Sequence, residues 1–560
     1  MGIQQPNLLA NSTPKLAPLR PARYTSLRVG MAGVAGLSLA ALWWRRRRPH
    51  RAALTRLYHE SQRIVRRLLA AWWQLSSLQR MLVIILGVSA VAVRGWVVVH
   101  CPITDDELTS YDCYVHPGLA LTASNYSLPN NHILYNLLVG MLGKLSIFKP
   151  DLLQRIPAVL ISLGLLPICY LLLLQYLRFS AATLALGLFT FMPTPTFYAV
   201  AGRGYSLVLA AMVAGFFATL VLMRRGPHRL AKVIFVLSGS AGLYAVPTHV
   251  WVLVAFGLVL LLTYLRQPWR LARVKITWLA GATVGIGATA VLLYSPVGAI
   301  SGWPALFQNS YVASSLRWND FWQGLYNPYL LDAASRLWGH GRWSTAMLAG
   351  LAVLAPFGLV RVRPALRPLG WLSYVILFLP LLLMVEQRIY MPPRTLLASA
   401  LCVYILLATL GQEAAQLVRL PQKRNWQVGK TISLFLGLVG YGAFHLYPET
   451  RNVQALVLRT TALRRQYAWL RARQPHRIWL DERSRALQGI YWRHMGLLAQ
   501  APLPLVVADK LPARAESQVT EYVAMARRAG EGLPPALSLP VYTDEYLVAW
   551  QLAFSKPEKY

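Results

Sequence analysis

The sequence predicts a polytopic α-helical membrane protein, and three observations support this fold class. Of the 560 residues, 56% are hydrophobic and only 14% are charged, whereas soluble domains carry roughly a quarter charged residues. Apolar runs of spanning length recur along the chain, which indicates repeated membrane crossings. Lys and Arg outnumber Asp and Glu by 56 to 20, and they gather between the apolar runs. This placement favours a role in topology and contact with anionic lipid headgroups, and it argues against a nucleic-acid-binding protein.

We expect about 11 to 12 transmembrane helices, because that many apolar runs approach the roughly 17–25 residues that a tilted helix needs. The expected spans are 81–100, 156–177, 180–198, 205–223, 231–247, 248–265, 275–295, 344–361, 369–385, 395–412 and 430–447. The shorter run 29–44 is either an extra membrane helix or a segment that lies on the membrane surface. Four arginines follow it in place of the small-residue cleavage site of a secretory signal.

Basic segments set the predicted topology. They cover residues 45–80, 224–232, 266–275, 361–368 and 419–430. The positive-inside rule places all of them in the cytoplasm. The expected spans satisfy this rule only if the apolar segment 130–148 does not cross the membrane. We therefore expect 130–148 to be a juxtamembrane helix at the outer surface.

Three regions follow from this topology. Residues 1–80 are a basic N-terminal region, and residues 81–447 are the membrane domain, with external loops at 101–155 and 296–343. Residues 448–560 form a small extracytoplasmic α/β domain. Its expected strands are 477–481, 503–509 and 546–552, and the segment 516–530 has a helical pattern.

The first external loop contains an unusual group of acids. Asp105, Asp106 and Glu107 are consecutive, and no Lys or Arg occurs from residue 101 to residue 143. A carboxylate at the mouth of a helix bundle can act as a general base, bind a metal or cap a helix. Neighbours on a helix point about 100° apart, so we expect one or two of these acids to face a shared pocket.

Two arginines fall on the same predicted face as the acids. Arg203 lies in "GRGY" and Arg394 in "PPR", each at the outer end of an expected span. An arginine there is either a side chain that snorkels to the membrane surface or a ligand for an anion. Two arginines facing an acidic loop favour an anionic substrate group such as a phosphate.

Four segments, in this order, carry a resemblance to a known family. They are "TDDELTSYDCYV" (104–115), "LPNNHILYNLL" (128–138), "RIPAVLISLGLLPICYLLLLQYL" (155–177) and "AGRGYSLVL" (201–209). Together they resemble the C-type integral-membrane glycosyltransferases. The closest similarity is to bacterial members of the dolichyl-phosphate-mannose protein mannosyltransferase family, and a more distant one is to the lipid A aminoarabinose transferases. The similarity covers about residues 81–265 and afterwards only "MPPR".

The resemblance implies an enzyme that transfers a hexose or a pentose from a polyprenyl-phosphate carrier to an acceptor on the outer side. In this family an Asp followed by Glu in the first external loop is the presumed base, which matches Asp106 and Glu107 as catalytic residues. Asp105 is an additional acid without a family counterpart, and we expect it to contact the substrate. The arginine motif matches Arg203 and Tyr205.

The match is looser at other positions. Arg394 corresponds only approximately to the arginine of a late outer loop. The family often has "HP" after the acidic loop, whereas this chain has "NNHI" around His132. By this reading Arg394, with Arg203 or Arg388, holds the donor phosphate. Asp106 takes the acceptor's proton, and attack opposite the phosphate inverts the anomeric centre. No nucleotide-binding Gly-rich loop is expected or found.

Other binding roles stay open at this stage. His132 and His249 could join Asp106 or Glu107 around a divalent cation, or His249 could simply make a hydrogen bond beside Pro247. Asn131 either contacts sugar hydroxyls or belongs to an ordinary turn. The metal ligands are therefore unassigned, and no cofactor is certain.

The predicted protein is a multi-pass enzyme of the inner or plasma membrane, active in the cell envelope. Its partners are the bilayer, a polyprenyl-phosphate sugar and a lipid, glycan or protein acceptor. The alternative is a transporter or flippase of a lipid-linked anionic solute, which would use the same arginines. Transporters often show internal repeats, and this sequence has none. A membrane scaffold without catalytic activity is a third reading, which the acid triplet disfavours.

Overall fold

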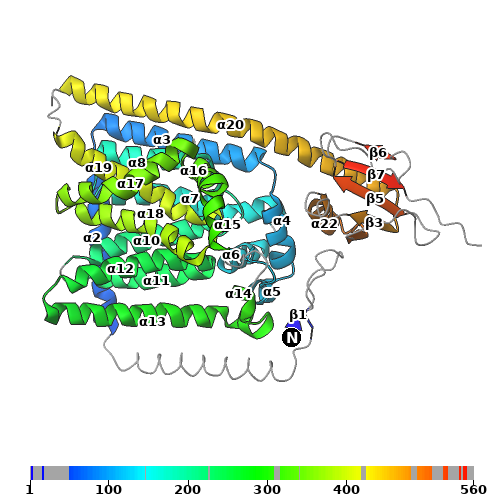
Figure 1. Cartoon of the computed structure of the whole chain (residues 1–560), viewed down its shortest axis with the longest axis horizontal. Helices are drawn as coiled ribbons and strands as arrows, with labels where there is room; N and C mark the ends of the chain where they lie inside the picture. The colour runs from blue at the N-terminus through cyan, green and yellow to red at the C-terminus, as the bar shows by residue number, and fades with distance from the viewer. Residues whose placement is uncertain are drawn as a thin grey trace, which may run out of the picture.

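The structure is a computed structural model. It describes residues 2–3, 16–17, 50–145, 147–224, 228–307, 316–339, 341–417, 424–480, 488–507, 521–526, 541–543 and 547–551. The predicted run 29–44 lies outside these residues. Long helices form a bundle, short helices cover one end of it, and a small sheet lies beyond that end (Figure 1). The predicted fold class, a polytopic helical membrane protein with a small C-terminal sheet, is confirmed.

Eight helical segments within the described residues are long and apolar enough to cross a membrane. They are α3 (Ser77–His100), α7 (Pro150–Leu173), α10 (Tyr205–Leu222), η2 (Pro247–His249) with α12 (Val250–Leu265), α13 (Trp269–Ile300), α17 (Gly341–Arg361), α18 (Arg367–Gln387) and η4 (Pro393–Leu396) with α19 (Leu397–Leu417). The other three expected spans also form helices: α8 (Phe179–Thr190), α11 (Arg229–Ala245) and the first half of α20 (Arg424–Ala472). All 11 expected spans thus coincide with helices in the described part of the chain, and eight of the helical segments there meet the length and composition of a membrane span.

Helix ends follow local sequence signals. Ser76 caps α3 through a capping box with Gln79, and Pro150 is the first residue of α7, where its missing N–H costs nothing. Within the bundle, α10 packs on α11 and α18 packs on α19. Small and apolar side chains of α8, α10, α12 and α19 fill the common core, as close packing of helices in lipid requires.

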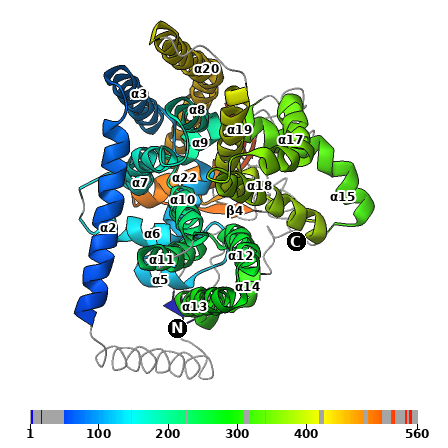
Figure 2. The same ribbon diagram turned by 90° about the vertical axis from the view of Figure 1, so that its left-hand side faces the viewer.

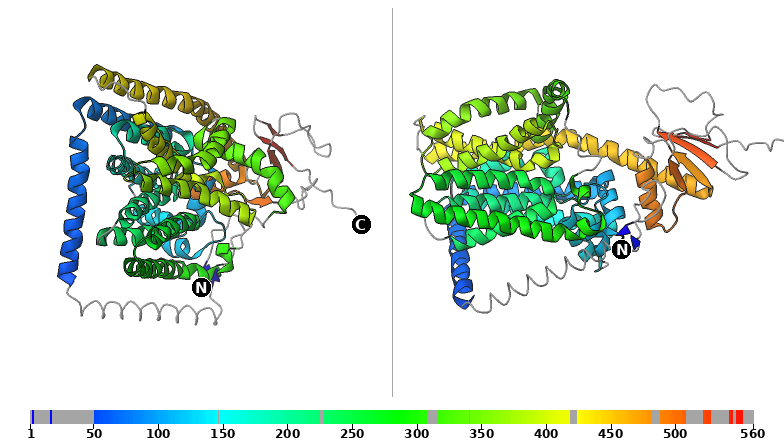
Figure 3. Two further views of the ribbon diagram at one scale, coloured as in Figure 1. Left: turned by 60° about the vertical axis from the view of Figure 1, so that its left-hand side comes forward. Right: turned by 60° about the horizontal axis from the view of Figure 1, so that its bottom comes forward.

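The basic connections lie together at one end of the bundle, called here the basic end. The backbone N–H of Arg178, before α8, donates to Gln412 of α19, and Arg363, between α17 and α18, pairs with Glu413. Helix α2 (His50–Trp73) lies across this end (Figures 2 and 3), where its Glu60 accepts from the backbone N–H of Leu230. This clustering agrees with the predicted arrangement of basic loops. The side of the membrane that this end faces stays a prediction.

The opposite end, called here the loop end, carries the short helices. The first loop forms α4 (Asp105–Ser110), η1 (Tyr111–Val115), α5 (Leu119–Ser124) and α6 (Ile133–Gly143). Helix α6 has 11 residues, too few to cross a bilayer, and Tyr135 and Val139 bury it against α7. The juxtamembrane prediction for 130–148 agrees with this placement. Also in chain order are α9 (Pro193–Tyr198), α14 (Pro304–Phe307), α15 (Trp318–Gly324), η3 (Leu325–Leu330) and α16 (Leu331–Trp338).

Helix α20 continues past the bundle into the C-terminal domain (Figure 1). The domain has a five-stranded sheet of order β4-β3-β5-β7-β6 and one described helix, α22 (Ile490–Leu498). The strands are β3 (Arg477–Leu480), β4 (Leu505–Val507), β5 (Glu521–Ala526), β6 (Tyr542–Thr543) and β7 (Leu547–Gln551), and a separate pair joins β1 (Gly2–Ile3) to β2 (Leu16–Ala17). The three predicted strands coincide with β3, β4 and β7.

The helix predicted for 516–530 is wrong where the structure describes it. Residues Glu521–Ala526 form β5, the central strand, which runs parallel to β3 and antiparallel to β7. Tyr522, Val523 and Ala524 are buried in succession, so both faces of this strand are covered. A strand buried on both faces lacks the alternating pattern that marks a strand in sequence, and its pairing overrides the local helical pattern.

Candidate active site

The acid triplet begins α4, and the structure separates its three carboxylates. Thr104 caps the helix: its side-chain oxygen accepts from the backbone N–H of Glu107, and the Glu107 carboxylate accepts from the backbone N–H of Thr104. This reciprocal capping box fixes where the helix begins. Because successive side chains point about 100° apart, Asp105, Asp106 and Glu107 face three different surroundings.

Asp106 lies between two arginines from distant parts of the chain. Its Oδ2 atom is 2.9 Å from Nη1 of Arg203 and 3.7 Å from Nη1 of Arg394. The Asp106 side chain is 48% exposed, against 4% for Arg203 and 38% for Arg394. Asn130 donates to the backbone carbonyl of Asp106 at 2.9 Å. An accessible carboxylate is therefore held beside two positive charges.

Two turns at the loop end supply the arginines. Arg203 lies between α9 and α10, and Arg394 lies in η4, just before α19. Pro392 and Pro393 precede Arg394, and their fixed φ angles restrict the shape of this turn. The guanidinium carbon of Arg203 is 5.8 Å from the ring centroid of Tyr205. The structure thus brings the predicted residues Asp106, Arg203, Tyr205 and Arg394 together.

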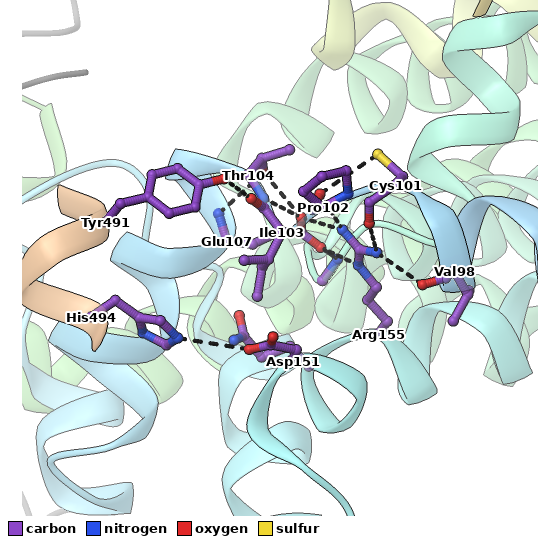
Figure 4. A network of polar contacts seen from close by, with 12 residues as sticks. Val98, Cys101, Pro102, Ile103, Thr104, Glu107, Asp151, Arg155, Tyr491 and His494 are labelled. Atoms are coloured by element: carbon purple, nitrogen blue, oxygen red, sulfur yellow. Dashed lines mark hydrogen bonds and ion pairs between the residues drawn. The ribbon is translucent and has the colours of Figure 1, made fainter. Parts of the chain in front are cut away.

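Glu107, the second predicted catalytic residue, is fully buried and faces away from these arginines. It pairs with Arg155 through two hydrogen bonds of 3.0 Å and accepts from the backbone N–H of Gly202 at 2.6 Å (Figure 4). Burial alone would raise its pKa, but Arg155 and the backbone donors of Gly202 and Thr104 lower the pKa of Glu107 below its usual range. Glu107 therefore joins α4 to α7 and to the turn that carries Arg203.

His132 contacts the same turn from the other side. Its Nδ1 atom accepts from the backbone N–H of Gly204 at 3.0 Å, and its Nε2 atom is 3.0 Å from Nη2 of Arg203. Burial, followed by the charges of Arg203 and Arg394, lowers the pKa of His132 well below its ordinary value, so the ring is neutral. A Cβ on Gly204 would lie 2.7 Å from Nδ1, so only glycine allows this close contact.

Asp105 faces the C-terminal domain and not the arginine pair. Burial raises its pKa, and the positive charge of Arg459 on α20 opposes that rise. Its negative charge also contributes to raising the pKa of Tyr491 on α22, to about 12, although burial is the main cause. The predicted role of Asp105 in substrate binding gains no support from this position.

Asn131 is committed to the loop itself. Its Nδ2 atom donates to the backbone carbonyls of Thr122 and Asn125, at 2.8 and 2.7 Å. Its Oδ1 atom accepts from Nδ2 of Asn136 at 2.9 Å. Asn131 is buried and holds α5 against α6. All these hydrogen bonds are made within the loop, so the predicted contact of Asn131 with sugar hydroxyls gains no support.

Arg388 and His249 also lie apart from Asp106. Arg388 ends α18 in a left-handed conformation, and its guanidinium is 5.3 Å from the ring centroid of Trp318. His249 is buried against Gly242 of α11. Within the described part of the chain, no group of three or more His, Cys, Asp or Glu side chains could hold a metal ion. The cation site considered from sequence is therefore not assembled by these residues.

The sequence reading missed Arg155, the partner of Glu107. Arg155 is buried at the start of α7, where it also donates to the backbone carbonyls of Cys101 and Pro102, at 2.7 and 3.0 Å (Figure 4). A signal was present, because an arginine next to a long apolar run demands a partner. The sequence did not say which of the three acids that partner would be.

A narrow cavity lies beside the site, inside the bundle. Its volume is about 30 Å³, and Tyr198 and Tyr205 line its wall together with apolar residues of α7, α8, α10 and α19. It extends from Tyr205, the first residue of α10, to Val213, about two turns further along that helix. The buried Arg94 of α3 also lines this cavity, whereas Asp106, Arg203 and Arg394 are not among its lining residues.

Comparisons with known proteins identify the fold. No protein-family model and no curated protein sequence matches the chain. Among solved structures, ArnT from Cupriavidus metallidurans bound to undecaprenyl phosphate superposes with a TM-score of 0.50 at 12% identity, over 85% of this chain and 99% of ArnT. The chain has the fold of ArnT. The resemblance noted in the sequence is thus confirmed for the fold.

Two further structures are similar. ArnT from the same organism in the apo state gives a TM-score of 0.49 at 13% identity, over 85% of this chain and 99% of that one. The arabinosyltransferase EmbB from Mycobacterium smegmatis gives 0.37 at 16% identity, over 60% of this chain and 30% of EmbB.

Proposed function

We propose that this protein transfers a hexose or a pentose from a polyprenyl-phosphate carrier to an acceptor on the extracytoplasmic side of the inner or plasma membrane. One observation carries the proposal: the accessible Asp106 carboxylate lies 2.9 and 3.7 Å from two arginines at the end of a membrane bundle. A base beside two cations suits a reaction with an anionic leaving group. The ArnT structure of the same fold contains undecaprenyl phosphate.

The reaction needs one base and no acid. Asp106 accepts the proton of the acceptor's hydroxyl or amine as that atom bonds to the anomeric carbon. The bond between the anomeric carbon and the phosphate oxygen breaks, and the electron pair leaves with polyprenyl phosphate. Arg394 and Arg203 stabilise the charge that grows on the leaving phosphate. Attack opposite the phosphate inverts the anomeric configuration.

The two arginines divide this work. Arg203 is buried and also contacts His132, so it holds Asp106 in place. Arg394 is partly exposed and lies further from the carboxylate, so its guanidinium is accessible to the donor phosphate. His132 is neutral, so it adds no positive charge beside Arg203. A charged imidazolium there would repel the Arg203 guanidinium.

Glu107 acts as a positioning residue in this account. Its carboxylate is fully buried and paired with Arg155, so a substrate has no access to it. By linking Thr104 and Gly202, it fixes Asp106 on one side and Arg203 on the other. A buried ion pair adds little to the free energy of unfolding, because both charges lose their hydration. Here its hydrogen bonds instead hold the surrounding segments in one arrangement.

The carrier lipid would lie in the bilayer against the bundle, because its isoprenoid chain is apolar. The cavity at Tyr198 and Tyr205 has a volume of only about 30 Å³, which holds no more than one or two water molecules. The chain would therefore lie between helices outside this cavity, while its phosphate remains at Arg394. The acceptor, whether lipid, glycan or protein, would then approach the exposed side of Asp106.

A turnover assay tests the proposal against the transporter alternative. Purified protein in liposomes is given a panel of polyprenyl-phosphate sugars with an envelope lipid extract, and free polyprenyl phosphate is measured by mass spectrometry. A transferase cleaves the bond between the sugar and the phosphate. A flippase moves the intact lipid to the other leaflet, and movement without cleavage would contradict the proposal.

A further inference from the structure

A second cavity lies where the membrane bundle meets the C-terminal domain. Its volume is about 790 Å³, within the roughly 300–1,000 Å³ of known small-molecule sites. The ends of α3 and α7 form one wall, and α20 and α22 form the other. Arg155 and His494 belong to these walls (Figure 4), whereas Asp106 does not. The cavity is therefore distinct from the proposed active site.

The walls carry an excess of positive charge. The exposed side chains of Lys149, just before α7, and Arg464 of α20 line the cavity. The positive charge of Arg464 acts on the Asp151 carboxylate. Burial alone would lower the pKa of His494, but the hydrogen bond to Asp112 and the nearby charge of Asp151 raise this pKa to about 9, so the ring is protonated at neutral pH. Among the described residues that line the cavity, Asp151 is the one acid, and it lies 3.7 Å from His494.

The same walls expose apolar side chains. Val99 of α3 is 76% exposed, Leu152 of α7 is 41%, Val457 of α20 is 40% and Leu498 of α22 is 46%. Val99 and Leu152 belong to the last and first turns of two membrane-length helices, so they lie at the level where hydrocarbon meets headgroups. Apolar walls with exposed cations at this level match an amphipathic molecule with an anionic head.

We propose that this cavity binds an anionic phospholipid, with its phosphate between Lys149 and Arg464 and its acyl chains along Val99 and Leu152. The bound lipid would join the bundle, through Lys149, to the C-terminal domain, through Arg464. It would hold the domain over the loop end without taking part in the transfer reaction. This inference does not depend on the proposed transferase activity.

Lipid titration of the full-length protein in detergent tests the site. Phosphatidylglycerol, phosphatidylcholine with the same acyl chains, and inorganic phosphate are added separately, and native mass spectrometry and the unfolding temperature are recorded. Phosphatidylglycerol should bind and raise the unfolding temperature, and the other two should not. Lys149→Gln with Arg464→Gln should weaken its binding roughly tenfold or more, since each cation near a membrane surface attracts an anionic lipid.

The control removes the same charge from neighbouring positions. Lys144 and Arg465 are exposed and do not line the cavity, so Lys144→Gln with Arg465→Gln should bind phosphatidylglycerol as the wild type does. If the double variant does not fold, the single variant Lys149→Gln replaces it in this test, because Lys149 is exposed. The proposal would be overturned if both double variants lost the same affinity for phosphatidylglycerol, or if the wild type bound phosphatidylcholine as tightly as phosphatidylglycerol. Protection by inorganic phosphate alone, or loss of lipid binding in Arg394→Gln, would also overturn it.

Discussion

At the scale of single residues, the site depends on which of three adjacent acids faces which partner. The sequence predicted Asp106 next to an arginine pair, and the geometry brings Asp106, Arg203 and Arg394 together. The sequence did not separate the roles of Asp106 and Glu107, because these roles depend on Arg155, which lies 48 residues after Glu107. Nor could spacing exclude Arg388, which is only six residues from Arg394 but lies over Trp318.

Arg394 should contribute mainly to donor binding. Arg394→Gln removes a charged hydrogen-bond donor and should weaken binding of polyprenyl phosphate about 10- to 100-fold. Arg394→Lys keeps the charge but loses the planar fork, so an intermediate loss is expected. Scintillation proximity binding of a labelled polyprenyl phosphate measures both effects.

The matched control is Arg336→Gln, since Arg336 lies on α16 at the loop end and pairs only with Asp332 among the described side chains. Its affinity for the lipid should equal that of the wild type. Unchanged lipid affinity in Arg394→Gln would remove Arg394 from the phosphate site.

At the scale of elements, α22 is fastened to the first loop by a charged contact. Nδ1 of His494 is 2.7 Å from Asp112 of η1, and Nε2 is 3.7 Å from Asp151 of α7. The sequence placed an α/β domain here but could not find this contact, since its partners are more than 340 residues apart. The same limit explains β5, whose strand character comes from pairing with β3 and β7.

The His494 contact should make stability depend on pH. The folded pKa of about 9 lies above the ordinary histidine value of 6.5, so the contribution of this contact to stability is complete below about pH 6.5 and is lost as the pH rises through 9. At pH 6, His494→Gln should lower the free energy of unfolding by about 1.5–3 kcal/mol, and this difference should shrink toward pH 9.5.

Thermal unfolding of wild type and variant across this pH range measures the effect. His116→Gln is the control, because His116 is an exposed histidine in the same loop. A difference between His494→Gln and wild type that stays constant from pH 6 to 9.5 would show that the charge on His494 is not involved.

At the scale of the whole molecule, composition and the positions of basic segments predicted most of the architecture. They predicted the bundle, the non-crossing helix at 130–148 and the C-terminal domain. The number of spans was less predictable, because α8 and α11 have only 12 and 17 residues and the first half of α20 runs into a helix of 49 residues. Whether a short apolar helix belongs to the bundle depends on the helices that it packs against, which its length does not reveal.

The orientation of the bundle can be tested by labelling single cysteines introduced at exposed positions. We expect an impermeant maleimide to label His116→Cys and Gln500→Cys from outside intact cells, and Arg229→Cys and Arg270→Cys only after the cells are opened. All four native cysteines are buried, so the unmodified protein gives the background. Labelling of His116→Cys and Arg229→Cys from the same side would contradict the topology.

The central claim is that Asp106 is the base, and one comparison tests it most directly. Single-turnover transfer from a polyprenyl-phosphate sugar is measured for Asp106→Asn and Asp105→Asn, alongside donor binding. Asp106→Asn should lower the transfer rate about 10²–10⁴-fold while the protein still folds and binds donor. Asp105 faces α20 and α22, so Asp105→Asn should lower the transfer rate far less. A fully active Asp106→Asn would contradict the account, whatever the behaviour of Asp105→Asn.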